Sequence, residues 1–496
     1  MTSAEAYEAL LAHLKEEAAL GQVAQLLHWD QEAMMPPKGA HQRAEQAAAL
    51  MGVLHARRAD PRIEDWLAAI DPETLDETGR WNLYWTRKRH QRAVSIPAGL
   101  AIESARIRTL AHEVWVDARA RRSFADFAPI LGQLIDLTRA QAECLRGEGQ
   151  SLYDALLEEY EPGATEAGLA AMFGRLRPRL ARLAERAAGN GRAAPRLQGR
   201  FPEEAQLDLA RKIAAALGYD FDAGRLDLVV HPFMTGTRGD VRITARIAPD
   251  DPLYCLLAVI HETGHALYEQ GLDPELAWQP AGASVSMGVH ESQSRLFENQ
   301  IGRSAAFAEY LFPLMRGSFG EIGITTADEL YRTINQVQPG FLRTEADEVH
   351  YNLHIMLRFD LERAMLMGNL PVEDLEDAWN TRFAADFGRE VPHAADGVLQ
   401  DVHWSAGLIG YFPTYTLGNI HAAVLWAALR RDISDMDALI RAGEFAPLVN
   451  WLRAKVHERG SRGLPGEIIA DACGEQPSEE PLLDYLEAKF GDLVPA

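Results

Sequence analysis

The stretch DPLYCLLAVIHETGH, residues 251–265, decides the fold around which the rest of the chain can be placed. Its apolar residues recur at steps of three and four, which is typical of a helix with one buried face. Asp251 and Pro252 form a typical helix start, and Gly271 is a typical stop. The sequence therefore predicts a rigid helix of ordinary length with its polar end near Gly271.

The second half of this helix carries two histidines at metal-binding spacing. His261 and His265 are four residues apart and project from one face, with Glu262 beside them. Two imidazoles so placed can bind one metal ion, and a neighbouring Glu can move protons there. We therefore predict a zinc-hydrolase type of site, with a solvated or core-lining histidine pair as the alternative.

A catalytic zinc needs a third protein ligand and an open position for water. Downstream, residues 290–298 read HESQSRLFE and begin a second helical pattern. Glu291 is the preferred third ligand, because a set of two His and one Glu is common in peptide-cleaving zinc enzymes. Spacing alone leaves His290 open as a rival. Glu298, two turns after Glu291, is placed to support the ligands from behind.

One stretch before the metal helix has a strand pattern. Apolar and polar residues alternate over 240–247, and the preceding segment 228–233 is rich in β-forming residues. We predict a small β-ribbon beside the metal helix, with 240–247 as a possible cleft wall that pairs with a peptide backbone. The alternative is a structural ribbon with Arg242 and Arg246 in solvent.

The remaining chain is rich in Ala, Leu, Glu and Arg and predicts a mainly α fold. The clearest helical segments are 3–20, 40–58, 98–121, 127–147, 166–188 and 203–217. Breaks are predicted at 36–39, 161–163 and 189–202. We expect one domain over 1–496, with an N-terminal lobe at 1–200, a catalytic lobe at 201–496 and a groove between them.

The composition of the chain limits which binding partners and which cellular compartment can be expected. A net charge of −23 argues against a nucleic-acid surface, since phosphate binding relies on clustered Lys and Arg. The three cysteines form no Cys-x-x-Cys pair, so neither a disulfide framework nor a thiolate zinc site is indicated. No segment is long and apolar enough for a membrane span, and the first residues show no basic stretch followed by an apolar core, so we expect no secretory signal. We expect a cytoplasmic protein without nucleic-acid or membrane partners.

Taken together, the motifs resemble those of the carboxypeptidase Taq family of metallocarboxypeptidases. In chain order they are Trp29-Asp30-Gln31-Glu32, Tyr153 to Gly163, His231-Pro232-Phe233, Asp240-x-Arg242-x-Thr244, His261-Glu262-x-x-His265, His290-Glu291-Ser292-Gln293, Leu342-Arg343-x-x-Ala346-Asp347 and Gly397-x-x-Gln400-Asp401-x-His403-Trp404. The resemblance implies a two-lobed helical zincin with a deep groove, similar in shape to neurolysin-like peptidases. It also implies a homodimer that removes single amino acids from peptide C-termini, with broad specificity.

The resemblance also implies a ligand set. His261 and His265 match the family's histidine ligands, Glu291 matches its third ligand, and Glu262 matches its catalytic acid/base. This favours the carboxylate over His290. We expect one divalent metal ion per chain, with zinc preferred and cobalt or manganese as alternatives, because this donor set tolerates several ions.

Recognition of a free C-terminus requires a fixed cation, and Arg suits a carboxylate because its planar fork binds both oxygens. Arg343 is the first candidate and Arg242 the second. The alternative for each is a structural ion pair, with Asp347 or Asp240 as the partner.

Stabilising the developing oxyanion requires a hydrogen-bond donor. Tyr411 and His231 are the leading candidates, ahead of Tyr415 and His403. For each of these side chains, packing in the core is an equally good interpretation.

Two other classes of function remain open from the residues alone. The same site could cut peptides internally or from the N-terminus, in which case acidic groups would be expected near the substrate amine. Alternatively, a helical scaffold could keep the metal for folding, with a closed site of four ligands and no purpose for Glu262.

Overall fold

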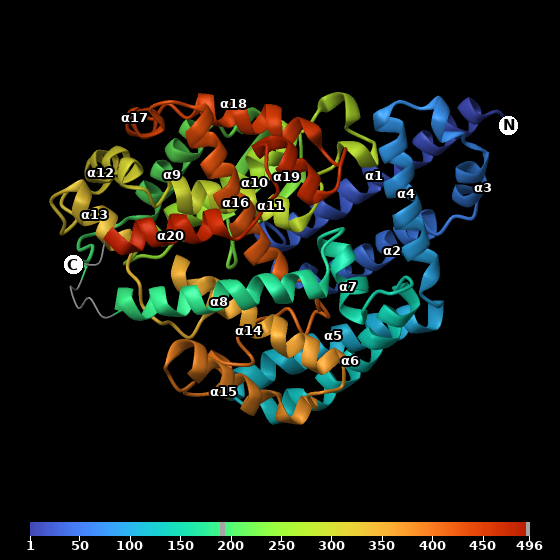
Figure 1. Ribbon diagram of the computed structural model, residues 1–496, viewed down its shortest axis with the longest axis horizontal. Helices are drawn as coiled ribbons and strands as arrows, with labels where there is room; N and C mark the ends of the chain where they lie inside the picture. Colours follow the sequence, from blue (N-terminus) through green and yellow to red (C-terminus); the bar gives the residue numbers. More distant parts are fainter. Residues whose placement is uncertain (189–193, 493–496) are drawn as a thin grey trace.

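The computed structural model describes residues 1–188 and 194–492 and is mainly helical (Figure 1). The first helices are α1 (Ser3–Ala33), α2 (Ala40–Arg58), α3 (Arg62–Ala69), α4 (Glu77–Ser95), α5 (Ala98–Arg121), α6 (Phe124–Leu145), α7 (Leu152–Tyr160), α8 (Glu166–Ala188) and α9 (Glu203–Leu217). Strands β1 (Gly224–Leu228), β2 (Met234–Thr237) and β3 (Asp240–Ala245) follow.

The second half continues with helices that surround the metal motif. They are α10 (Pro252–Gly271), α11 (Met287–Arg295), α12 (Ala305–Phe319), α13 (Ala327–Ile334), α14 (Glu348–Leu366), α15 (Leu375–Phe387), α16 (Pro413–Asp432), α17 (Met436–Ala442), α18 (Ala446–Lys455), α19 (Pro465–Cys473) and α20 (Glu480–Asp492). A single π-helical turn at Leu296–Ile301 extends α11. Within the described residues, no helix is long and apolar enough to cross a membrane.

The helical segments expected from periodicity correspond to α1, α2, α5, α6, α8 and α9, and the mainly α fold is confirmed. The first segment is longer than expected, because α1 continues to Ala33. The predicted breaks at 36–39 and 161–163 separate α1 from α2 and α7 from α8. Of the predicted break at 189–202, residues 189–193 lie outside the described part of the chain.

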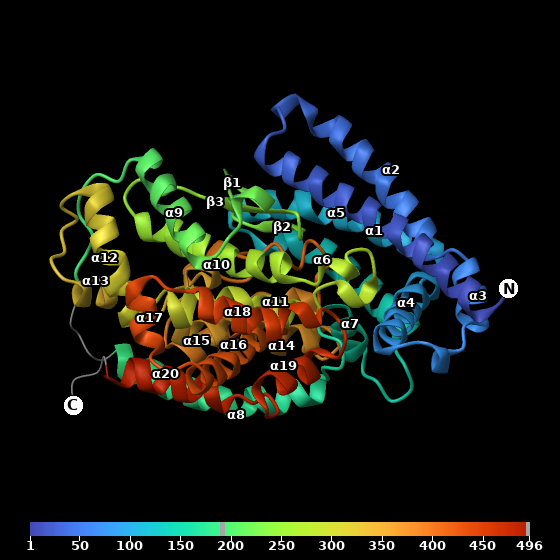
Figure 2. The ribbon, with the colours of Figure 1, turned by 90° about the horizontal axis from the view of Figure 1, so that it is seen from above.

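The three strands form one small sheet in the order β1-β3-β2. β1 pairs with β3 in parallel, and β2 pairs with β3 antiparallel. The sheet lies between α1 and α10 (Figure 2). The predicted ribbon is present, but 240–247 as the cleft wall is wrong, because β3 has a neighbour on both sides. Residues 229–233 lie between β1 and β2 rather than within a strand.

Helix α10 lies at the centre of the fold and contacts the sheet, α9 and α11. Asp251 begins the helix by accepting a hydrogen bond from the Leu253 N–H at 3.0 Å, which satisfies one of the free donors of the first turn. Apolar side chains bury the helix along most of its length, including Cys255. This packing fixes the position of the helix, so that His261, Glu262 and His265 line the groove at defined places.

The contact between α10 and α11 depends on Gly264. A Cβ atom at this position would lie 2.5 Å from the carbonyl oxygen of Gln293 and 2.6 Å from the Cα of Ser294. Those atoms belong to the backbone of α11 and cannot rotate away. The glycine therefore allows the two helices to approach closely at the level of the histidines.

Helices from both halves of the chain share one hydrophobic core. In Figure 1, α8 and α20 lie side by side across the middle, and they contact each other. Helix α14 packs against α8 and α15, and it also contacts α6 and α7, so the second half returns to the first. The lobe division at residue 200 remains a prediction about the chain's organisation.

Replacing Gly264 by Ala is expected to lower the free energy of unfolding by about 1–3 kcal/mol, the usual cost of overpacking a tight core. Thermal unfolding followed by circular dichroism measures this. Gly52→Ala is the control, because Gly52 lies within α2 with nothing within 4 Å of a Cβ there. That change should raise the stability by roughly 0.5–1 kcal/mol. Equal melting temperatures for Gly264→Ala and the unmodified protein would refute the close-approach argument.

Candidate active site

The predicted ligands lie together where α10 crosses α11. Oε2 of Glu291 lies 3.3 Å from Nε2 of His265 and 3.7 Å from Nε2 of His261. One ligand atom from each of these residues lies within 4.8 Å of the other two. Within the described residues, no other group of three His, Cys, Asp or Glu side chains meets this condition. Two neutral imidazoles and a carboxylate are a donor set that fits a divalent metal ion.

His261 is oriented from behind by Glu298. Nδ1 of His261 lies 2.9 Å from Oε2 of Glu298, which comes from the π-helical turn after α11. A metal-binding imidazole usually donates its other N–H to such a carboxylate, which fixes the tautomer. Arg295 and Arg303 also contact Glu298, at 3.3 and 3.0 Å. The predicted supporting position of Glu298 is therefore seen in the structure.

His265 is oriented through a second histidine. Its Nδ1 lies 2.6 Å from Nδ1 of His290, whose Nε2 lies 3.2 Å from Oε1 of Glu269. With Nε2 of His265 directed to the metal position, its Nδ1–H donates to His290, and the Nε2–H of His290 donates to Glu269. His290 is thus placed behind a ligand rather than in the group of three.

The charge states of His265 and Glu291 favour metal binding. Burial lowers the pKa of His265 to about 3, so its imidazole is neutral and its Nε2 lone pair is free. Burial alone would raise the pKa of Glu291, but the Arg295 guanidinium holds it well below its ordinary range. Nε of Arg295 donates to Oε1 of Glu291 at 2.7 Å, while Oε2 faces the two imidazoles.

Glu262 lies beside the ligands and lines the same groove. Burial raises the pKa of its carboxyl to about 7, and the neighbouring His261 opposes this rise. A group that titrates near neutral pH can both accept and release a proton during one reaction cycle.

The ligands open onto a long groove of about 1170 Å³. One wall consists of the free edge of β2, where Met234, Thr235 and Gly236 line the groove. The segment Ser284–Met287, which leads into α11, lines it as well. The edge strand that faces the cleft is therefore β2. Its unpaired backbone groups are placed to pair with an extended peptide.

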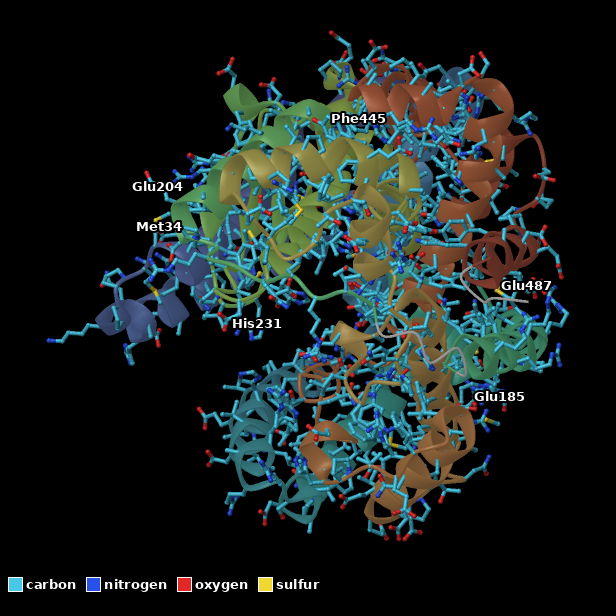
Figure 3. All side chains as sticks on the ribbon, turned by 90° about the vertical axis from the view of Figure 1, so that its left-hand side faces the viewer. Met34, Glu185, Glu204, His231, Phe445 and Glu487 are labelled. Carbon is cyan, nitrogen blue, oxygen red and sulfur yellow. The ribbon has the colours of Figure 1, made fainter. Side chains whose placement is uncertain are left out.

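The predicted oxyanion candidates lie at different places. Tyr411 and Tyr415 line the groove, and burial raises the pKa of Tyr411 to about 12, so its hydroxyl keeps its proton. Nε2 of His403 lies 3.1 Å from the Tyr415 hydroxyl, behind the groove wall. His231 is exposed at the edge of the opening (Figure 3), while its neighbours Pro232 and Phe233 line the groove.

Arg242 and Arg343, the two residues predicted to bind the substrate carboxylate, each form an ion pair with an Asp of the protein. Arg242 binds Asp240 and stacks over Trp29, outside the groove lining. Arg343 is buried and binds Asp401 through Nε and Nη2, at 3.0 and 2.8 Å. Its partner is thus not the Asp347 considered from the sequence.

Arg343 lies behind the groove wall, in contact with Tyr415. The Arg343 guanidinium lies 4.8 Å from the centre of the Tyr415 ring, and that ring lines the groove. Its Nη1 contacts the Tyr351 hydroxyl at 3.1 Å. Asp401 also binds Arg358, so one carboxylate serves two guanidinium groups. This group keeps one positive charge in excess.

Sequence reasoning missed two residues of the site. Glu269 supports His290 and stands four residues after His265 on α10, and Arg295 stands four residues after Glu291 on α11. A residue four positions from a ligand lies on the same face of the helix. The spacing in the sequence could therefore have identified Glu269 and Arg295.

A family model described as carboxypeptidase Taq (M32) metallopeptidase matches residues 9–490. The chain is 41% identical to thermostable carboxypeptidase 1 of Thermus thermophilus, over 99% of this chain and 100% of that protein. It is 36% identical to carboxypeptidase 1 of Bacillus subtilis, over 97% of each chain.

Solved structures agree with these matches. The crystal structure of an M32 carboxypeptidase from Deinococcus radiodurans R1 superposes with a TM-score of 0.95 at 38% identity, over 99% of both chains. Metallocarboxypeptidase 1 of Trypanosoma cruzi gives a TM-score of 0.96 at 35% identity, over 98% of this chain and 99% of that one.

Replacing Glu298 by Gln is expected to weaken metal binding by roughly 10–100-fold, because the carboxylate that orients His261 loses its charge. Competition with a chromogenic chelator measures the affinity without any need for turnover. Asp208→Asn on α9 serves as a control outside the site. Unchanged affinity in Glu298→Gln would contradict the supporting role.

Proposed function

The chain belongs to the carboxypeptidase Taq family of metallopeptidases, and we propose that the cluster between α10 and α11 is its metal centre. As a member of this family, it is a metallocarboxypeptidase that cleaves peptides at the C-terminal end. A non-catalytic scaffold and an aminopeptidase are thereby excluded. The observation that carries the proposal is the convergence of His261, His265 and Glu291 on one point of the groove.

We propose zinc as the metal ion, with cobalt or manganese as alternatives, because two imidazoles and one carboxylate form a common catalytic zinc set. When bound, such an ion lowers the pKa of water and polarises the scissile carbonyl group. Each of the two histidines has its rear nitrogen engaged, so both front nitrogens keep a fixed direction. Metal analysis of the purified protein tests the identity.

The proton transfers are assigned to Glu262. Its carboxylate accepts a proton from the attacking water and passes it to the amine of the departing residue. Tyr411 is proposed to donate to the developing oxyanion, since it lines the groove and its hydroxyl stays protonated. His231 is a second candidate, and its exposure at the rim means that it would have to reach inward.

Arg343 is proposed as the cation for the free C-terminus, with Arg242 as the second candidate. Three of the five N–H donors of Arg343 are used in contacts with Asp401 and Tyr351. The Arg343–Asp401–Arg358 group carries excess positive charge, which a substrate carboxylate would neutralise. The contact of Arg343 with Tyr415 places this charge directly behind the groove wall.

We also propose that the protein is a homodimer with broad specificity for the removed residue and that it acts in the cytoplasm. The dimer rests on the resemblance to the family, and the compartment is supported by three free cysteines without a disulfide. Sedimentation velocity, a peptide set varied at its last residue and cell fractionation test these proposals in turn.

Glu262→Gln should retain the bound metal and lower kcat by about 10²–10⁴-fold, because the substituted amide cannot accept the proton. Elemental analysis measures the metal, and mass spectrometry of peptide digests measures turnover. Turnover close to that of the unmodified enzyme, with metal bound, would show that another group is the general base.

Arg343→Ala should lower kcat/KM for peptides with a free C-terminus by roughly 30-fold or more, the effect of losing a buried charged contact. Activity on peptides with an amidated C-terminus should fall much less. Arg358→Lys is the matched control, because it disturbs the same Asp401 and should affect both peptide types equally. Equal losses for both peptide types in Arg343→Ala would refute the anchor role.

A further inference from the structure

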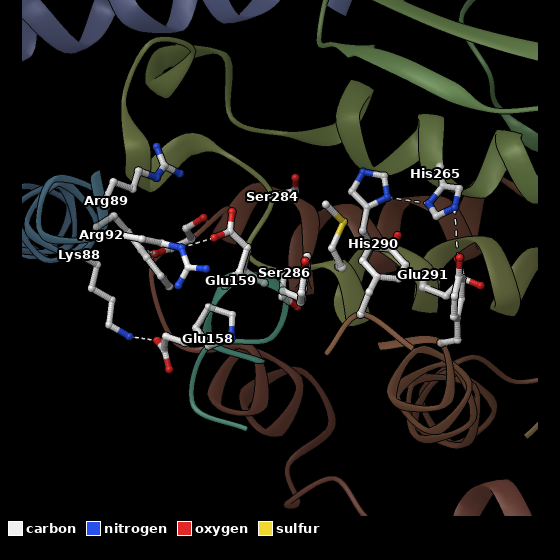
Figure 4. A pocket seen from close by; sticks show the side chains of 18 of the residues that line it. Lys88, Arg89, Arg92, Glu158, Glu159, His265, Ser284, Ser286, His290 and Glu291 are labelled. Atoms are coloured by element: carbon white, nitrogen blue, oxygen red, sulfur yellow. Dashed lines mark hydrogen bonds and ion pairs between the residues drawn. The ribbon is translucent and has the colours of Figure 1, made fainter. Parts of the chain in front are cut away.

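The end of the groove away from the metal cluster carries several cations. Lys88, Arg89 and Arg92 line it from α4, and Arg146 lines it from the loop after α6. Figure 4 shows this group at one end of the pocket and the His265–Glu291 pair at the other. In a chain with a net charge of −23, such a concentration of positive side chains in one cleft is unexpected.

Three of these four cations are neutralised by ion pairs. The pairs are Lys88 with Glu158, Arg92 with Glu159, and Arg146 with Glu143. The first two pairs are drawn with dashed lines in Figure 4. They form part of the groove wall and add little net charge.

Arg89 differs from its neighbours. It is exposed to the groove and, within residues 1–188 and 194–492, makes no ion pair or hydrogen bond. The two carboxylates that act on it are Glu17 and Glu159. Glu17 is bound to Arg58 at 2.8 Å, and Glu159 is bound to Arg92. The positive charge of Arg89 is therefore free for a ligand.

The direction in which a peptide lies in the groove indicates which part of it would reach Arg89. A carboxypeptidase has only one residue beyond the scissile bond, so the long arm of the groove must hold the part of the peptide before that bond. The groove continues from Glu262 along the β2 edge and Ser284 to the α4 side chains. Extended peptide backbone paired with β2 would carry alternate side chains toward the walls at this end.

We propose that Arg89 forms an anion subsite that selects peptides with an acidic side chain at one position N-terminal to the scissile bond. Its planar guanidinium suits a carboxylate, and no resident carboxylate must be displaced. The neighbours Lys88 and Arg92 are paired with their own carboxylates, and the positive charge of Arg89 disfavours a basic side chain there. This inference rests on the proposed direction of peptide binding along the groove.

The test uses peptides of one length with a constant C-terminal residue, in which a single Glu is moved stepwise through a neutral sequence. A matching series carries Gln at each position. At the position that reaches Arg89, kcat/KM should be roughly three- to tenfold higher for Glu than for Gln, as for a partly screened charge pair. High salt should reduce this ratio toward one.

Arg89→Gln should bring the Glu-to-Gln ratio to about one while the Gln peptides are cleaved as before, and Arg89→Lys should keep part of the preference. Arg87→Gln is the matched control, an exposed Arg on the same helix that does not line the groove. Its ratio should equal that of the unmodified enzyme. A ratio of one at every position, or a preference that survives in Arg89→Gln, would overturn the subsite.

Cys144 offers a readout that does not depend on turnover. It is an exposed free thiol that lines the same end of the groove, whereas Cys255 and Cys473 are buried. In the Glu262→Gln variant, the Glu peptide should slow alkylation of Cys144 more than the Gln peptide does. Equal protection by both peptides would contradict the subsite. Absence of C-terminal shortening for every peptide would instead refute the proposed function.

Discussion

The site depends on how closely the backbones of α10 and α11 approach each other at Gly264. A Cβ at this position would lie 2.5 Å from the carbonyl oxygen of Gln293, so only glycine allows this contact, which sets the level of α11 against the two histidines. On the other side of α11, a Cβ at Gly418 of α16 would lie 2.5 Å from Cγ of Glu291. Gly264 thus lets α10 approach α11, and Gly418 leaves the space that the Glu291 side chain occupies against α16.

This packing has an electrostatic consequence, because it buries a carboxylate next to two imidazoles. An isolated buried carboxylate would be costly, and Arg295 makes it tolerable by binding Oε1. The same burial keeps His265 neutral. His265 and Glu291 therefore have the protonation states that a divalent cation requires, and Glu298 and His290 hold the ring orientations from behind.

Local features of the chain were readable from sequence, because they depend on neighbours within a few residues. Apolar periodicity located α2, α8 and α9, and Asp251 with Pro252 located the start of α10. The order of the strands could not be predicted from the sequence. β3 lies between β1 and β2, and its pairing with β1 joins strands that are not consecutive in the chain. Arg343 could be singled out by its motif, but its partner Asp401 lies 58 residues away, beyond the reach of any spacing rule.

Two positive charges lie at the wall of the groove or directly behind it, although the chain as a whole is strongly acidic. One belongs to the group in which Arg343 and Arg358 share Asp401, close behind the wall at Tyr415, and the other is Arg89 at the far end. Negative charge elsewhere on the surface repels acidic peptides at long range, but it is screened over about 8 Å at physiological salt. Inside the groove, low-dielectric walls preserve the local field, so these cations would act on a bound peptide more strongly than the distant surface charge does.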